Sequence, residues 1–261
     1  MLFEKVFEPI HAGNLTLRLA ENEADVFAAQ RLRYRIFCEE MGAVANLAVQ
    51  QQKRDFDMYD DACYHLIVID NNRVGDARVV GTYRLLTRTN MPLVGSFYSE
   101  TEYDMTTIKA NPAELMELGR SCVEQQYRTR PVIQMLWQGI GAFIAAKKIE
   151  LMFGCASFHG VNVKEHIHAL SYLHHYHLAP EAIRPKALPA HYVNMNLMPK
   201  EEVVPRAALA VLPPLIKGYL RLNGVVGDGA VLDYAFNTCD VSIVVQTSTM
   251  QERYAQRYLP D

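Results

Sequence analysis

The chain has little of what marks an exported or membrane-spanning protein. Its amino-terminal segment carries acidic residues where a signal peptide carries a basic flank, and it has no continuous apolar core of adequate length. The most apolar later run, residues 207–216, contains two prolines and is far shorter than the ~20 apolar residues of a bilayer-spanning helix. The sequence therefore predicts neither export by a signal peptide nor a transmembrane helix.

An excess of basic residues is missing as well. The chain has 26 Lys and Arg against 29 Asp and Glu, a formal net charge of -3, whereas a protein that binds nucleic acid needs a surplus of positive charge. The 5 cysteines are odd in number, are scattered and form no C-x-x-C pair. This pattern indicates neither a disulfide framework nor a zinc ribbon. Nucleic acid is not an expected partner, and a reducing cytoplasmic location is favoured.

The composition is that of a folded protein, with 50% hydrophobic and 21% charged residues over 261 residues. Apolar periodicity, turn residues and a proline at a helix start predict the following elements. They are a strand at 14–19, a helix at 21–41, a hairpin of strands 63–70 and 78–86, a strand at 115–123, a helix at 131–146 and a strand at 150–156. We expect a single mixed α/β domain over residues 1–261, with an irregular excursion around residues 179–214.

Four aspartates fall close together, at positions 55, 57, 60 and 61. Their mutual repulsion requires a cationic partner. A calcium loop of the EF-hand type is disfavoured, because the run lacks the glycine and the glutamate that such a loop supplies at its sixth and twelfth positions. A solvated acidic loop, a loop that binds internal arginines and a loop that binds an amine substrate all remain open.

Glu117 interrupts the apolar strand expected at 115–123. A buried carboxylate is costly, so it must be ion-paired, neutralised or used in chemistry. Arg120 follows three residues later, and that spacing places the two side chains on opposite faces of a regular strand. A structural ion pair remains an alternative to a catalytic role for Glu117.

Other common catalytic signatures are absent. The histidine-rich stretch at 166–177 lacks the spacing of a zinc site and is consistent with surface or loop-packing histidines. The chain has no G-x-S-x-G elbow, no Walker A loop and no G-x-G-x-x-G after a strand. We therefore expect no metal and no bound cofactor, and we exclude serine hydrolases, P-loop nucleotidases and dinucleotide enzymes.

Several charged residues together resemble the signature of the acyl-homoserine-lactone synthases, enzymes with a GNAT-class acyltransferase fold. They are Arg33, Phe37, Asp57, Asp60, Arg84, Glu117 and Arg120. The chain is more similar to the ornithine N-acyltransferases of bacterial ornithine-lipid synthesis, sometimes labelled hemolysin-like. The segments that carry this similarity include RYRIFCEEMGA, FDMYDDACYHLIV, VVGTYRLL, ELGRSCV and LPPLIKGYLRLNGVVGDGAV. The signalling synthases typically have a glycine-tryptophan pair where this chain has Gly42 and Ala43.

The resemblance implies an α/β, GNAT-like fold with a mixed central sheet flanked by helices. It implies an enzyme that transfers a long 3-hydroxyacyl group from acyl carrier protein to the α-amine of ornithine, which gives a lyso-ornithine lipid. Acylation of lysine or glutamine and acyl-homoserine-lactone synthesis from S-adenosylmethionine are the alternatives, and a non-enzymatic membrane-perturbing protein is the least favoured. Residues 212–222 could make a peripheral contact with the inner membrane face, although a helix packed on the protein's own core is favoured.

The resemblance also assigns roles to residues. Glu117 is the expected catalytic base for the attacking amine. The expected substrate-binding residues are Arg33, Phe37, Asp57, Asp60, Arg84 and Arg120. The two aspartates either orient a cationic amino acid or hold the arginines, and the opposite-face argument gives Arg120 a structural or carrier-facing role. Arg128 and Arg130 are expected to meet the acyl carrier or its phosphopantetheine phosphate at the start of the 131–146 helix.

Overall fold

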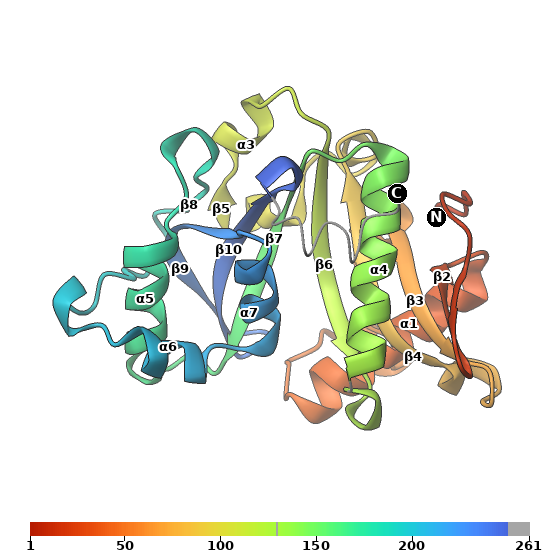
Figure 1. Ribbon diagram of the computed structural model, residues 1–261. Helices are drawn as coiled ribbons and strands as arrows, with labels where there is room; N and C mark the ends of the chain where they lie inside the picture. Colours follow the sequence, from red (N-terminus) through yellow and green to blue (C-terminus); the bar gives the residue numbers. More distant parts are fainter. Residues whose placement is uncertain (129, 250–261) are drawn as a thin grey trace. The chain divides into compact units, whose positions relative to one another are not determined.

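The computed structural model of the chain describes residues 1–128 and 130–249 (Figure 1). The chain divides into two compact units, one containing residues 1–96 and 116–149 and the other residues 97–115 and 150–249. The single-domain organisation stays a prediction. The first unit contains β1 (Ile10–Ala12), β2 (Leu15–Leu19), α1 (Glu23–Tyr34), a π-helix (Arg35–Glu40), α2 (Leu47–Gln52), β3 (Tyr64–Asp70), β4 (Val79–Thr87), β6 (Leu115–Val123) and α4 (Arg130–Lys147).

The strands of the first unit form an antiparallel run in the order β1-β2-β3-β4-β6. The predicted hairpin is confirmed, since β3 and β4 pair with Tyr64 opposite Leu85 and Ile67 opposite Thr82. All residues of both strands are buried. Near-continuous apolar strands of this kind require cover on both faces of the sheet.

Helices α4 and α1 provide that cover. The long helix α4 runs along β2, β3 and β4 (Figure 1). Its Gly139 allows a close approach, because a Cβ there would lie 2.6 Å from Leu17 Cδ2 and 2.9 Å from Leu66 Cδ1. Helix α1 packs on β3 and β4, where its Leu32 joins Ile67 and Ile36, a residue of the following π-helix, in an apolar cluster.

The helix predicted at 21–41 is present but changes character along its length. It begins at an N-cap, Asn22, whose side chain accepts a hydrogen bond from the Asp25 amide. From Arg35 the turns widen to a π-helix, in which the Met41 amide donates to the Ile36 carbonyl. The change from α-helix to π-helix falls between Arg33 and Phe37. These two residues, four apart in the sequence, are therefore not separated by one regular α-helical turn.

The strand predicted at 115–123 is confirmed as β6, but it contains a β-bulge. Gly119 lies opposite Arg84 and Cys122 opposite Thr82, so Arg120 and Ser121 both face Tyr83. Arg120 has a left-handed backbone conformation, with φ of 49°. A bulge of this kind adds one residue to the strand and redirects the side chains that follow it.

The second unit is a mixed sheet in the order β7-β10-β9-β8-β5, with a parallel pairing only between β8 and β9 among its described ladders. The predicted strand at 150–156 is confirmed within β7, and the expected excursion contains short elements that include β8 and α6. The elements are β5 (Tyr103–Asp104), α3 (Thr106–Ala110), β7 (Leu151–His159), α5 (Ile167–His177), β8 (Lys186–Ala187), α6 (Pro205–Val211), α7 (Pro214–Arg221), β9 (Val225–Asp233) and β10 (Thr238–Gln246).

None of the helices within residues 1–128 and 130–249 combines the length and the apolar character that a membrane crossing requires. The segment 212–222 forms α7, whose Ile216 and Tyr219 are buried. Helix α7 packs against β7 of the same unit, as the favoured interpretation of that segment predicted.

Candidate active site

The aspartate loop of the first unit is organised by its own sequence. Asp57 caps the short 3-10 helix Met58–Asp61, and its Oδ1 accepts a hydrogen bond from the Tyr59 amide at 2.9 Å. Asp60 reaches back, and its Oδ2 accepts a hydrogen bond from the Asp57 amide at 3.2 Å. This reciprocal capping box explains why the two aspartates stand three residues apart, and it fixes both carboxylates relative to one backbone turn.

Arg33 of α1 binds this loop from inside the protein. Its Nε lies 2.7 Å from Asp55 Oδ2, and its Nη1 and Nη2 lie 2.9 and 3.0 Å from the two oxygens of Asp60. The Arg33 side chain is only 1% exposed. Burial alone would lower the pKa of Arg33, but the charges of Asp60 and Asp55 outweigh it and hold this pKa above its usual range.

Arg84 of β4 binds the same loop from the sheet. Its Nη1 lies 2.5 Å from Asp57 Oδ1 and 3.1 Å from Asp60 Oδ1. Burial would raise the pKa of Asp60, but the charges of Arg33 and Arg84 reverse the effect and hold this pKa well below its usual range. Asp60 and the two arginines that bind it are therefore all ionised. Because Asp55 and Asp60 are buried, the interpretation of this run as a solvated acidic loop is wrong for these two residues.

Arg120 completes the network through the bulge in β6. Its Nη2 lies 3.3 Å from Asp57 Oδ2, and its Nε lies 3.3 Å from Asp55 Oδ2. Arg84 and Arg120 thus share the carboxylate of Asp57. The three-residue spacing predicted that Arg120 points away from the face of Glu117, and this prediction is wrong because the bulge at Arg120 interrupts the alternation of the strand.

Glu117 lies on the same face of the sheet as Arg84. It is directly opposite Leu86 of β4, and Arg84 is two residues from Leu86 on that strand. The Glu117 side chain is buried, at 5% exposure, and its charge acts on the thiol of Cys63. The structure therefore places a buried carboxylate on the sheet face that carries the arginine–aspartate network.

His65 is a member of this site that was not among the predicted site residues. Its Nε2 lies 3.0 Å from the Asp60 carbonyl, and the side chain is fully buried in β3 opposite Arg84. Burial lowers the pKa of His65 to about 4. The ring is therefore neutral near pH 7 and donates its Nε2 hydrogen to the Asp60 carbonyl, so His65 also binds the loop.

Two of the remaining predicted residues, Phe37 and Arg128, make contacts outside the network. Phe37 is partly buried and packs against the apolar cluster that contains Leu32 and Ile36. Arg128 forms a surface ion pair with Glu40, with Nη1 2.5 Å from Oε1, and its Nε donates to the Val123 carbonyl. The side chain of Arg130 lies outside the described residues, although its backbone begins α4.

The fold and this site define a class of protein. Residues 32–138 match the acetyltransferase (GNAT) domain family. The solved structure of FeeM, an N-acyl amino acid synthase from uncultured soil microbes, aligns with a TM-score of 0.51 at 8% identity, over 92% of this chain and 93% of that one. The chain thus has the GNAT acyltransferase fold, as expected.

Two relatives identify the family within that class. The L-ornithine N(alpha)-acyltransferase of Agrobacterium fabrum is 46% identical over 250 residues, which cover 94% of this chain and 85% of that protein. The enzyme of the same name from Rhizobium meliloti is also 46% identical, over 95% of this chain and 86% of that protein. The chain belongs to the L-ornithine N(alpha)-acyltransferase family, which confirms the resemblance read from the sequence.

Proposed function

We propose that this protein transfers an acyl group from the thioester of acyl carrier protein to the α-amine of L-ornithine. The observation that carries the proposal is the similarity over nearly the whole chain to relatives named L-ornithine N(alpha)-acyltransferase. The donor we propose is a 3-hydroxyacyl thioester, and the product is a lyso-ornithine lipid. No cofactor takes part in this reaction, since the thioester is a co-substrate.

Glu117 is the proposed catalytic base. An ammonium group has no lone pair, so the α-amine must lose a proton before it attacks the thioester carbonyl. The amine nitrogen then forms the new C–N bond, the C–S bond breaks, and the carrier thiol leaves with a proton. A buried carboxylate on the network face, at 5% exposure, is suited to accept the first proton directly or through water.

The contacts of the aspartate loop favour an indirect role for its most buried members. Arg33 and Arg84 are 1% and 4% exposed and bind Asp60 from two sides. We propose that these three residues set the shape of the acceptor site. Asp57 and Arg120 are more open, at 25% and 13% exposure, and are the proposed substrate-contacting pair.

We further propose that the start of α4 meets the phosphopantetheine phosphate. Free amide groups and the helix dipole favour an anion at a helix amino terminus. Arg128 stands just before this helix, where its pairing with Glu40 could be exchanged for a phosphate. Lys147 is not part of this proposed phosphate site, because an 18-residue helix spans about 27 Å and Lys147, at its far end, binds Glu4.

Peripheral contact with the inner membrane face from the cytoplasm is also part of the proposal, with α6 rather than α7 as the contact. Val204 precedes this helix and Val211 ends it, at 55% and 60% exposure, and Leu209 and Arg206 are exposed within it. Exposed apolar side chains beside a cation suit an anionic lipid surface. Flotation with phosphatidylglycerol vesicles should carry the wild type but not a Val204→Ser, Val211→Ser double variant.

The central experiment offers the purified protein 3-hydroxyacyl carrier protein with L-ornithine, L-lysine, L-glutamine or S-adenosylmethionine, and weighs the products by mass spectrometry. We expect Nα-acylated ornithine as the main product. A product from another amine alone would contradict the proposed acceptor, and turnover with acyl-coenzyme A but not with the carrier protein would contradict the proposed donor.

A further inference from the structure

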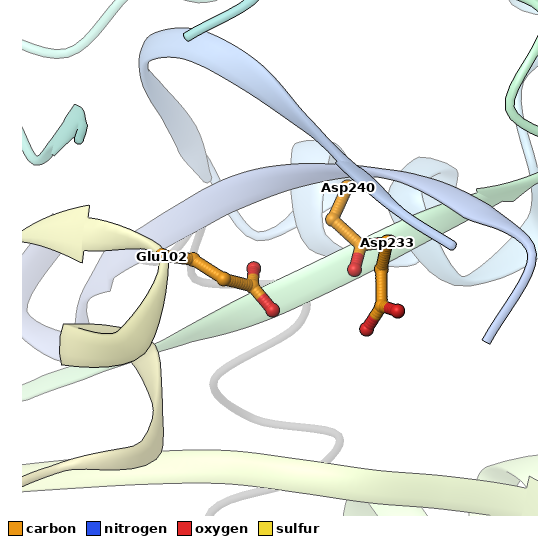
Figure 2. Close-up of side chains that lie close together, drawn as sticks. All are labelled: Glu102, Asp233 and Asp240. Carbon is orange, nitrogen blue, oxygen red and sulfur yellow. The ribbon is translucent and has the colours of Figure 1, made fainter. Parts of the chain in front are cut away.

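Three acidic side chains converge in the second unit (Figure 2). Glu102 comes from the segment before β5, Asp233 ends β9 and Asp240 lies within β10. One carboxylate oxygen from each lies within 4.8 Å of the others. Glu102 and Asp240 are buried, at 7% and 5% exposure. Figure 2 shows the Glu102 carboxylate directed toward the two aspartates.

Two buried hydroxyl groups point to a ligand at the same place. Thr238 and Ser242 are 3% and 0% exposed, and the Oγ atom of each has no hydrogen-bond partner among the described residues. They flank Asp240 at two-residue spacing on β10, so all three side chains share one face. Thr238 is also directly opposite Asp233. Buried hydroxyls without partners are costly, and a bound group would satisfy them.

We propose that these residues form a binding site for a divalent cation of the hard class, Ca²⁺ or Mg²⁺. Such ions take oxygen ligands at about 2.0–2.6 Å, so ligand oxygens can lie up to about 5 Å apart around one ion. The donors are carboxylates and hydroxyls, which suit hard ions rather than soft ones. A divalent ion also balances more of the charge of three carboxylates than an ammonium group does.

The orientation of Asp233 supports this assignment. Its Oδ1 accepts hydrogen bonds from the amides of Ala235 and Phe236, at 2.8 and 2.9 Å, in the turn that joins β9 to β10. These bonds hold the carboxylate in place before any ion arrives. The expectation of no metal came from local spacing, whereas these ligands are distributed between residues 102 and 240.

The test uses the full chain after treatment with EDTA and dialysis. Calorimetric titration with CaCl₂ and MgCl₂ should detect one site per chain for one or both ions. Saturation at a hundred times Kd should raise Tm by about 5 °C, because the ion binds only the folded state. Asp240→Asn should weaken binding of the ion roughly tenfold to hundredfold, and Glu102→Gln should weaken it by a similar factor. Because Glu102 lies outside the strands, Glu102→Gln replaces Asp240→Asn in the test if the latter does not fold. Asp228→Asn, in β9 but outside the cluster, is the matched control and should bind normally.

Two outcomes would overturn the proposal. One is that neither ion binds the wild type, or that both bind equally well to Asp240→Asn and Glu102→Gln. The other is that L-ornithine, and not a metal ion, raises Tm in a way that Asp240→Asn abolishes, which would make the cluster an ammonium site. Binding is measured without an acyl donor, so these outcomes are distinct from failure of the proposed acyl transfer.

Discussion

Each of the two units gathers three acidic side chains, but the surroundings differ. In the first unit, Asp55, Asp57 and Asp60 belong to one loop and bind arginines from α1, β4 and β6. In the second unit, the acidic residues come from three separate segments and lie beside buried hydroxyls that have no hydrogen-bond partner in the part of the chain that the structure describes. A short acidic motif can therefore indicate an internal ion network from the sequence alone. A cluster assembled by strand pairing cannot be recognised in this way, because its residues are far apart in the sequence.

The largest expected effect is at the centre of the arginine network. Arg33→Met should lower the free energy of unfolding by about 3–5 kcal/mol, because it leaves the carboxylates of Asp55 and Asp60 buried without this partner. Urea denaturation at pH 7 measures this loss. Arg31→Met removes an exposed ion pair with Asp76 and should cost less than about 1 kcal/mol. Equal losses in the two variants would contradict a structural role for the network.

The pH dependence of stability should report on His65. Its pKa is about 4 in the folded state against 6.5 when unfolded, so the unfolded state binds the extra proton between these values. Stability is therefore fully present above pH 6.5 and falls as the pH drops toward 4, by at most about 3 kcal/mol. His65→Gln keeps a donor for the Asp60 carbonyl and removes the titration. Its unfolding free energy should be nearly flat across this window, and an unchanged slope would mean that another group titrates.

Glu117→Gln should lower kcat roughly a hundredfold or more while Tm changes little, because the amide keeps the shape and loses the basic lone pair. The assay is single-turnover acylation of ornithine at neutral pH. Glu124→Gln, which alters a surface partner of Arg73 just after β6, is the control and should keep normal turnover. Near-normal kcat in Glu117→Gln would make that residue a structural acid.

The variants Asp57→Asn and Asp60→Asn should distinguish direct contact with the amino-acid substrate from structural support of the arginines. Asp57→Asn should raise KM for the amino acid roughly tenfold with kcat partly kept, as expected for loss of one charge-assisted hydrogen bond. Asp60→Asn should lower Tm and kcat together, because Asp60 binds both Arg33 and Arg84. Unchanged amino-acid kinetics with weaker carrier binding would place the loop at the carrier instead.

The smallest effect should come from the cysteines. Burial raises the pKa of Cys122 to about 12 and that of Cys155 well above its usual range, so both thiols stay protonated at neutral pH. Direct attack by an amine needs no acyl-cysteine. Cys122→Ala and Cys155→Ala should therefore keep normal turnover. An acyl-enzyme trapped with labelled donor in the absence of amine would show a covalent route.

Much of the fold could be predicted from periodicity and turn residues. The β3–β4 hairpin and β6 follow alternation and turn signals, and α4 begins beside a proline as expected. The sequence also indicated the charged residues of the candidate site, because Asp57 and Asp60 stand at the spacing of a capping box. It did not indicate the direction of the Arg120 side chain, since a bulge depends on the register with the neighbouring strand. His65 was not assigned to the site, because nothing beside it in the sequence shows that it faces Arg84.

The backbone at Arg120 carries a further consequence. A left-handed φ of 49° is a conformation that glycine adopts freely and arginine adopts at a cost of about 1–2 kcal/mol. Glycine at this position would ease the main chain but would remove the guanidinium that reaches Asp55 and Asp57. Arg120 thus combines a local backbone cost with ion pairs to two aspartates, so a substitution at position 120 changes main-chain strain and the charge of the site in opposite directions.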